Sequence, residues 1–301
     1  MHKKSNIVRV FIVLLVFASC SLQTRKEINT KKVMIPILKI KLQNITISPG
    51  KVRLITLDIA RINTGGKIKC HGKTFSYYTL ANKTIFALRE SYFSVQNSYK
   101  CFYEYQGQKY VILNVEVTPF SYPSERIRVN KKRVFLNTKD QARANIEQKM
   151  LNKIYAQGIT FPLFKSAFKV PLKSKITSKY GMRRIFNEKK KTQHLGTDFR
   201  ASIGVPIPVS NTGKVIFAGN LFYTGNTVIV DHGLGIYSVY GHLSKFRVNQ
   251  GDFIQRSTVI GFAGSTGRSS GPHLHWGVKV HGQYIDGFSL IQETKDFNKL
   301  L

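Results

Sequence analysis

The segment that decides the interpretation of this sequence is Gly267-Arg-Ser-Ser-Gly-Pro-His273-Leu-His275-Trp276. Successive side chains of a β-strand point to opposite faces, so His273 and His275 would project together from one face. Leu274 and Trp276 would lie on the other face, where apolar side chains can pack into a core. We therefore expect a strand that presents two imidazoles side by side.

Two upstream motifs carry chemically similar side chains. In His194-Leu-Gly-Thr-Asp198, an imidazole and a carboxylate stand four residues apart, and on a strand both would face the same side as Gly196. A glycine between them leaves room for a metal ion. His242 is expected at the point where a strand ends and a loop begins. Together the three motifs supply four histidines and one aspartate from distant parts of the chain.

Zinc suits this set of donors. It binds imidazole nitrogen and carboxylate oxygen, and its catalytic sites combine three protein ligands with one open position. Two of the five side chains would remain beside the metal, as the general base and transition-state stabiliser that hydrolysis requires. The spacing alone leaves open which of His273 and His275 is a ligand. It also leaves iron open, although the His-x-carboxylate pair typical of iron oxygenases is absent.

Taken together and in order, the motifs resemble the lysostaphin/LytM-like family of zinc metallo-endopeptidases. The matching stretches are His194-Leu-Gly-Thr-Asp198-Phe, Tyr240-Gly-His242-Leu-Ser and Gly267 to Trp276, supported by Ser178-Lys-Tyr-Gly-Met-Arg183 and Gly261-Phe-Ala-Gly-Ser-Thr-Gly267. The resemblance covers about residues 172–290. It implies a compact antiparallel β domain with a groove lined by these strands.

The resemblance also implies a role for each of the five residues. One Zn²⁺ ion would be bound by His194, Asp198 and His275. His242 and His273 would take the catalytic positions, activating the attacking water and stabilising the oxyanion. The implied substrate is the peptide stem or cross-bridge of bacterial peptidoglycan.

The presence of all five residues favours an active enzyme. The alternative is a catalytically silent envelope protein that activates another cell-wall hydrolase. Among active enzymes, we expect a D,D-endopeptidase that cleaves direct cross-links, and a glycine-bridge hydrolase is the alternative.

The charge of the chain requires an anionic partner. Its 301 residues include 47 Lys or Arg and only 15 Asp or Glu, a formal net charge of +32. Nucleic acid, a membrane surface or an anionic polymer would satisfy this excess. The predicted export described next argues against nucleic acid, and no helix or aromatic platform for bases is recognisable.

The N-terminus predicts export. Basic residues precede the apolar run Val10–Ala18, which is too short to span a bilayer and is typical of a signal peptide over residues 1–19. Cys20 lies where a bacterial lipoprotein carries its lipid, although Phe17 departs from the usual lipobox, so simple cleavage to a soluble product is the alternative. With residues 20–34 as a tether, we expect a periplasmic envelope protein anchored to a membrane through lipid on Cys20.

The fold class is expected to be mostly β. Short β-branched and aromatic runs in residues 35–135 predict a small antiparallel β-sandwich-like domain with a regulatory or positioning role, where an unidentified regulatory protein could act. Short apolar segments separated by glycines predict the compact antiparallel β peptidase domain over residues 160–301. A linker helix within residues 136–158 would connect the two domains and pack between them.

The linker helix has a predicted start and a predicted buried face. Thr138 and Gln141 are typical of a capping box. Four apolar residues recur at intervals of four and would face a core: Ala142, Ile146, Met150 and Ile154.

The remaining cysteines and histidines are expected to be structural. Apart from Cys20, the chain contains Cys70 and Cys101, and an oxidising compartment favours a disulfide between them, worth about 3–4 kcal/mol. His71 and His281 are expected in turns or loops, and His232 in a structural position.

Overall fold

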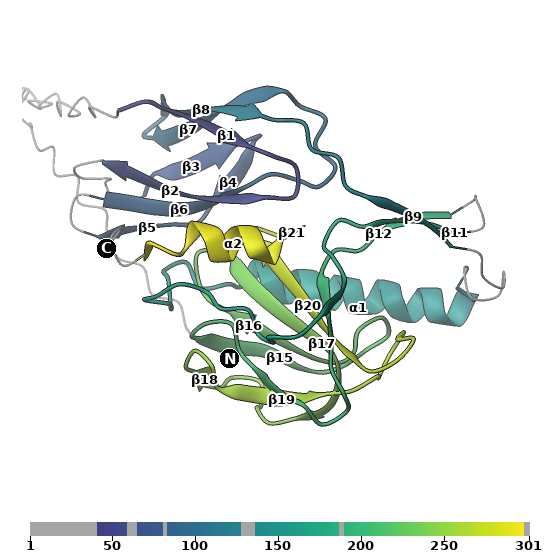
Figure 1. The fold of residues 1–301 in the computed structure, drawn as a ribbon. Helices are drawn as coiled ribbons and strands as arrows, with labels where there is room; N and C mark the ends of the chain where they lie inside the picture. Colours follow the sequence, from purple (N-terminus) through teal and green to yellow (C-terminus); the bar gives the residue numbers. More distant parts are fainter. Residues whose placement is uncertain (1–40, 59–64, 81–82, 128–135, 187–189, 298–301) are drawn as a thin grey trace, which may run out of the picture. The chain divides into compact units, whose positions relative to one another are not determined.

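Two β-sheets packed face to face form the N-terminal part of the structure (Figure 1). The computed structural model describes residues 41–58, 65–80, 83–127, 136–186 and 190–297. The predicted signal peptide, the tether and Cys20 lie outside these residues. Among the described residues, no helix is long and apolar enough to cross a membrane.

The first sheet has five strands and the second has three. The larger has the order β1 (Gln43–Ile47), β8 (Gln108–Val117), β7 (Ser98–Tyr105), β3 (Lys67–Cys70) and β4 (Lys73–Phe75). The smaller has the order β2 (Val52–Asp58), β6 (Lys83–Arg89) and β5 (Tyr77–Leu80). Ile55 and Phe86 of the smaller sheet share a buried cluster with Ile68 and Leu113 of the larger one, so the sheets form a sandwich. One feature differs from the all-antiparallel expectation, because β1 pairs with β8 in parallel.

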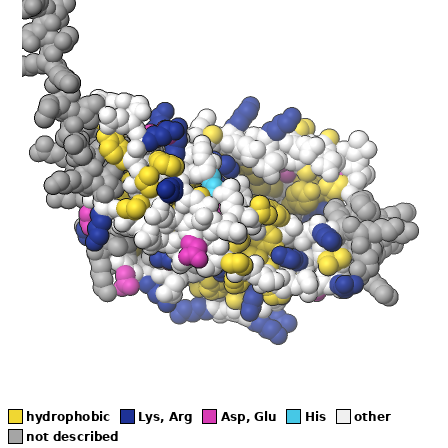
Figure 2. Space-filling model, turned by 90° about the horizontal axis from the view of Figure 1, so that it is seen from above, with side chains coloured by type: hydrophobic (Ala, Val, Ile, Leu, Met, Phe, Trp, Pro, Cys, Tyr) yellow, Lys and Arg dark blue, Asp and Glu magenta, His cyan; other side chains and the backbone are white. Residues whose placement is uncertain are grey.

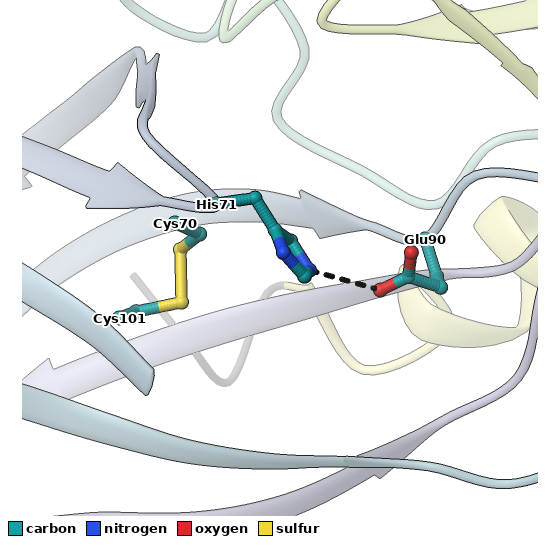
Figure 3. The surroundings of a disulfide bond; sticks show 4 residues. All are labelled: Cys70, His71, Glu90 and Cys101. Carbon is teal, nitrogen blue, oxygen red and sulfur yellow. Dashed lines mark ion pairs between the residues drawn. A yellow bond between two sulfur atoms is a disulfide. The ribbon is translucent and has the colours of Figure 1, made fainter. Parts of the chain in front are cut away.

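A disulfide joins the central strand of the larger sheet, β7, to its neighbour β3. Cys70 of β3 and Cys101 of β7 face each other in register, with their Cα atoms 4.4 Å apart, and their sulfur atoms are bonded. The predicted pairing is therefore confirmed. His71 follows in the turn after β3, and its Nε2 lies 3.7 Å from a carboxylate oxygen of Glu90 (Figure 3).

A sheet of ten strands forms the C-terminal part. Its main path is β10 (Ile176–Ser178), β13 (Thr197–Arg200), β20 (His273–Val280), β17 (Ile236–Phe246), β16 (Gly225–Asp231), β15 (Gly213–Leu221) and β18 (Phe253–Ile254). Beside it lie β14 (Pro206–Pro208), β19 (Val259–Ala263) and β21 (Gln283–Ile285). All of these pairs are antiparallel, as expected. Leu274 and Trp276 are buried in the core on one face of β20, which leaves the other face to the histidines.

The smaller sheet of the sandwich also packs on the C-terminal part. Val52 and Ile85 on its second face belong to the same buried cluster as Trp276. The short helix α2 (Gly287–Glu293) contacts β2, where Arg53 Nε lies 3.2 Å from a carboxylate oxygen of Glu293. Both parts belong to one compact unit over residues 38–301.

Helix α1 (Thr138–Ala156) differs from the prediction in its start and its buried face. Its N-cap is Asn137, whose side-chain oxygen accepts a hydrogen bond from the backbone N–H of Asp140 at 2.8 Å, so the capping box assigned to Thr138 is wrong. Ile146 is 68% exposed and Met150 is also exposed, so the proposed core-facing stripe is wrong as well.

The side chains of α1 that do pack lie on another face of the helix. Ala144 is buried, and Leu151 and Tyr155 pack on Tyr237 and Val239 of the ten-stranded sheet. The helix therefore packs on the C-terminal sheet, whereas the prediction placed it between the two domains.

A small separate sheet combines strands from both halves of the chain. It has the order β12 (Lys190–Gln193), β11 (Arg183–Phe186) and β9 (Ser124–Ile127). β11 and β12 are an antiparallel pair that ends just before His194. β9 belongs to the segment that leaves the sandwich and pairs with β11 in parallel.

Candidate metal centre

Three of the predicted site residues meet at one point. Asp198 of β13 and His275 of β20 are direct register partners, and His194 lies in the connection between β12 and β13. The donor atoms of the three side chains all lie within 4.8 Å of one another. Because β12 ends at Gln193 and β13 begins at Thr197, His194 does not lie on the same strand as Asp198, although we had expected one strand to carry both. Its backbone is instead fixed by a hydrogen bond from its N–H to the carbonyl oxygen of Met182 at 2.9 Å.

The spacing of these donors tests whether they fit zinc. His194 Nε2 lies 3.1 Å from Asp198 Oδ1, His275 Nδ1 lies 2.9 Å from the same oxygen, and the two nitrogens are 3.3 Å apart. A tetrahedral zinc ion with bonds of about 2.0–2.1 Å would hold its ligand atoms about 3.3–3.4 Å apart. The three atoms thus form a triangle close in size to one face of a zinc coordination tetrahedron, so the residues fit the ion.

The electrostatics keep the carboxylate charged. Burial of Asp198 favours its neutral form, but hydrogen bonds and charge interactions with His194 and His275 outweigh burial and hold the pKa of Asp198 well below its usual range. Burial lowers the pKa of His275, although the neighbouring carboxylate opposes this shift. A neutral imidazole and an ionised carboxylate are the forms that bind a metal cation.

His273 lies next to this triangle. Its Nε2 is 3.8 Å from Asp198 Oδ1, and its Nδ1 donates to the carbonyl oxygen of Gly271 at 2.8 Å. The hydrogen bond at Nδ1 orients the ring, so that Nε2 is the nitrogen turned toward the donor triangle.

His242 occupies an unusual position inside strand β17. The prediction placed it at the start of a loop, whereas β17 continues to Phe246 with its register interrupted around His242. The residue has a left-handed φ of 60°, which is uncommon for a side chain other than glycine. Hydrogen bonds hold it there: its N–H donates to the carbonyl oxygen of Thr224 at 2.6 Å, and its Nδ1 donates to that of Thr266 at 2.7 Å.

The distorted backbone brings His242 to the other histidines. Its ring centroid lies 4.6 Å from that of His273 and 5.9 Å from that of His275. Burial lowers the pKa of His242 to about 4, so the imidazole is neutral at neutral pH, with Nε2 free of a proton. All five predicted site residues are thus brought together.

The histidines expected to be structural lie elsewhere. His232 is fully buried, with Nδ1 donating to the Thr212 carbonyl oxygen at 2.8 Å and Nε2 2.7 Å from Ser238 Oγ. His281, in the turn between β20 and β21, packs edge-on against Phe75 of the sandwich.

Sequence reasoning missed the groups that orient the site. The carbonyl oxygen of Thr266 accepts a hydrogen bond from His242, and that of Gly271 accepts one from His273. Every residue has a backbone carbonyl, so the sequence does not indicate which of them orients a side chain. Ser178 was noticed only as part of a matching motif, yet its Oγ lies 3.0 Å from His194 Nδ1. Its position in that motif was the one available signal.

Comparison with known proteins locates the matching region. Residues 192–287 match the model of Peptidase family M23. Over 106 residues the chain is 39% identical to DD-carboxypeptidase/endopeptidase Mpg of Neisseria meningitidis, covering 35% of this chain and 24% of Mpg. Over 120 residues it is 38% identical to peptidoglycan DD-endopeptidase ShyA of Vibrio cholerae, covering 40% of this chain and 28% of ShyA. The chain thus spans only about a quarter of the length of these curated relatives.

One solved structure resembles most of the fold. A crystal structure from Pseudomonas aeruginosa, assigned to peptidase M23, superposes with a TM-score of 0.63 at 24% sequence identity. The match covers 82% of this chain and 95% of that one. At this identity the likeness concerns the fold alone, and its coverage extends well beyond the matched peptidase region.

Proposed function

We propose that this chain, whose residues 192–287 are a domain of peptidase family M23, is a zinc-dependent endopeptidase that hydrolyses peptide cross-links of bacterial peptidoglycan. The observation that carries the proposal is the donor triangle of His194, Asp198 and His275, with two further histidines beside it. The names of Mpg and ShyA support a D,D-endopeptidase specificity.

Three of the five side chains would bind the metal ion, and the other two would act directly in hydrolysis. His194 Nε2, Asp198 Oδ1 and His275 Nδ1 would hold Zn²⁺, which supplies Lewis-acid polarisation and lowers the pKa of water. His242 is neutral, and its Nε2 is free to accept the proton of the attacking water. His273 turns Nε2 toward the donor triangle, and its side chain would stabilise the oxyanion that forms on the scissile carbonyl.

The decisive experiment is digestion of purified sacculi. Mass spectrometry of the released muropeptides should show loss of cross-linked dimers and a matching gain of monomers, abolished by a chelator and restored by Zn²⁺. The Asp198→Ala protein serves as the matched control. Glycine-containing fragments would instead identify a glycine-bridge hydrolase, and loss of only a terminal residue from monomers would identify a carboxypeptidase. No release at all would favour the silent activator of another hydrolase.

The proposed location is the periplasmic cell envelope, with a lipid on Cys20. The support is the basic and apolar N-terminal sequence, together with a net charge of +32 that suits anionic lipid and cell-wall polymers. On the face drawn in Figure 2, Lys and Arg side chains clearly outnumber acidic ones. We expect the protein in the detergent-soluble membrane fraction and the Cys20→Ser variant in the soluble fraction. Equal distribution of the two proteins would contradict the lipid anchor.

The proposed role of the N-terminal half is to regulate access to the site. In β17, Tyr237, Val239 and Gly241 share one face, and Gly241 is the register partner of His275. Helix α1 covers that face: Leu151 packs there, and the backbone carbonyl of Tyr155 accepts a hydrogen bond from the Tyr237 hydroxyl at 3.0 Å. A bound substrate would have to share this face with the helix, and an unidentified regulatory protein could displace it.

Loosening α1 tests this role. Leu151→Ala should raise the rate of cross-link hydrolysis several-fold without changing zinc content, if the helix restricts access. Ile146→Ala is the matched control, since that side chain is exposed on the same helix. An unchanged rate for Leu151→Ala would assign the helix a positioning role.

A further inference from the structure

The ring of His194 is held from its far side. Its Nε2 faces Asp198 and His275, while its Nδ1 lies 3.0 Å from Ser178 Oγ and 3.1 Å from the carbonyl oxygen of Lys179. If Nε2 is to bind a metal, the proton must be on Nδ1, where these two oxygens can accept it. The groups at Nδ1 therefore select both the tautomer and the orientation of the ring.

Ser178 is itself fixed in two ways. It is the register partner of Asp198 in the pair of β10 and β13, and it is buried. Its Oγ also accepts a hydrogen bond from Arg184 Nη2 at 3.0 Å. The guanidinium group thus holds the hydroxyl at the position where it can accept from His194.

Arg184 comes from the middle strand of the small three-stranded sheet. On one side β12 leads directly to His194, and on the other side β9 pairs in parallel with β11. Glu125 of β9 is the register partner of Arg184, and its carboxylate oxygen lies 4.0 Å from Arg184 Nε. The backbone pairing of β9 with β11 therefore supports Arg184, whereas the Glu125 side chain is exposed and makes no hydrogen bond to Arg184 Nε.

We propose that Ser178 and Arg184 are positioning residues that orient His194 for metal binding, and that strand β9 supports them. This inference rests on the proposed zinc site but not on which bond the enzyme cleaves. It would connect the segment that leaves the sandwich to the metal centre through Arg184 and Ser178. Removal of the β9 contact should therefore weaken zinc binding, whereas loosening α1 should not.

The test measures zinc affinity by competition with a chelator in the full-length protein. We expect Ser178→Ala to weaken zinc binding about 10–100-fold, the usual effect of removing a partner that orients a metal ligand. Arg184→Met should weaken it about 3–10-fold, because Ser178 then keeps its place but loses the group that holds it. Arg184→Lys, which can still donate to Ser178 Oγ, should recover part of this loss. Lys191→Ala is the matched control, an exposed cation on the neighbouring strand β12.

A spectroscopic readout separates positioning from general stability. In the Co²⁺-substituted protein, the visible absorption bands report ligand geometry, and we expect them to shift in Ser178→Ala and Arg184→Met but not in Lys191→Ala. Thermal unfolding of the metal-free proteins shows whether each variant remains folded. Should Ser178→Ala leave both affinity and spectrum unchanged, the proposal is wrong; equal losses in Arg184→Met and Lys191→Ala would also overturn it. Failure of the sacculus assay with full zinc binding would instead reject only the proposed substrate.

Discussion

Gly196 lies directly against the ring of His275. A Cβ atom built at Gly196 would be 2.4 Å from His275 Cε1 and 2.9 Å from the backbone carbonyl oxygen of Trp276. Because side chains and backbone cannot approach this closely, any other residue would displace one of the three donor groups. The glycine is therefore required by the approach of β20 to the connection before β13.

The variant Gly196→Ala tests this close approach. We expect zinc affinity to fall by at least about 10-fold, because His275 must rotate or β20 must move away from Asp198. Chelator competition gives the affinity, and thermal unfolding of the metal-free protein shows whether the loss is local. If the folded variant bound zinc with wild-type affinity, the ring of His275 could move aside without weakening zinc binding, and the prediction would be wrong.

Alanine substitutions should separate the ligands from the catalytic histidines. We expect His194→Ala and Asp198→Ala to lose both zinc and hydrolysis. His242→Ala and His273→Ala should keep stoichiometric zinc and lose about 10²–10⁴-fold in rate, the usual effect of removing a general base or an oxyanion donor. Metal analysis and the sacculus assay give the two readouts. Stoichiometric zinc in Asp198→Ala would contradict the ligand assignment.

Loss of the disulfide should destabilise the protein without altering the metal centre. The bond between Cys70 and Cys101 closes a loop with a sequence separation of 31, and in the chain-entropy model it contributes about 3–4 kcal/mol. We expect the double variant Cys70→Ala/Cys101→Ala to lose this amount in chemical denaturation. Zinc affinity should stay unchanged, since the disulfide lies in the sandwich core. A parallel loss of zinc would show that the sandwich and the metal centre are tightly coupled.

His232 should make stability depend on pH. Burial lowers its pKa to about 4, against an ordinary value of 6.5. As pH falls below 6.5, the unfolded chain takes up a proton that the folded protein does not, so stability is lost between about pH 6.5 and 4. At pH 5 the loss from this group is about 2 kcal/mol relative to pH 8.

The measurement compares denaturant unfolding of metal-free protein at pH 5 and pH 8. His232→Asn will be less stable at both values, but its decline on acidification should be smaller than that of the wild type by about 2 kcal/mol. Identical declines would show that His232 does not remain neutral in the folded protein.

The predictions that succeeded depended on local geometry. Leu274 and Trp276 are buried opposite the two histidines, because strand alternation is fixed by backbone stereochemistry. The stripe assigned to α1 failed for an equally geometric reason. At about 100° per residue, Ala144, Leu151 and Tyr155 lie on the side of the helix opposite Ala142, and the spacing of the apolar stripe did not indicate which side meets the sheet. Ala144 and Tyr155, not Ile146, face the sheet.

The sequence by itself determined which side chains are present at the site: His194, Asp198, His242, His273 and His275. Their spacing left the metal and the ligand set open, and the resemblance of the motifs to the lysostaphin/LytM-like family indicated a zinc site. Only the tertiary structure decided how those groups are held. The left-handed backbone of His242 and the contact of Arg184 with Ser178 depend on strands that meet from distant parts of the chain. Such contacts form when strands that are distant in the sequence pack together. Hydrophobic periodicity predicts only which face of its own strand or helix a residue occupies, so it could not predict these contacts.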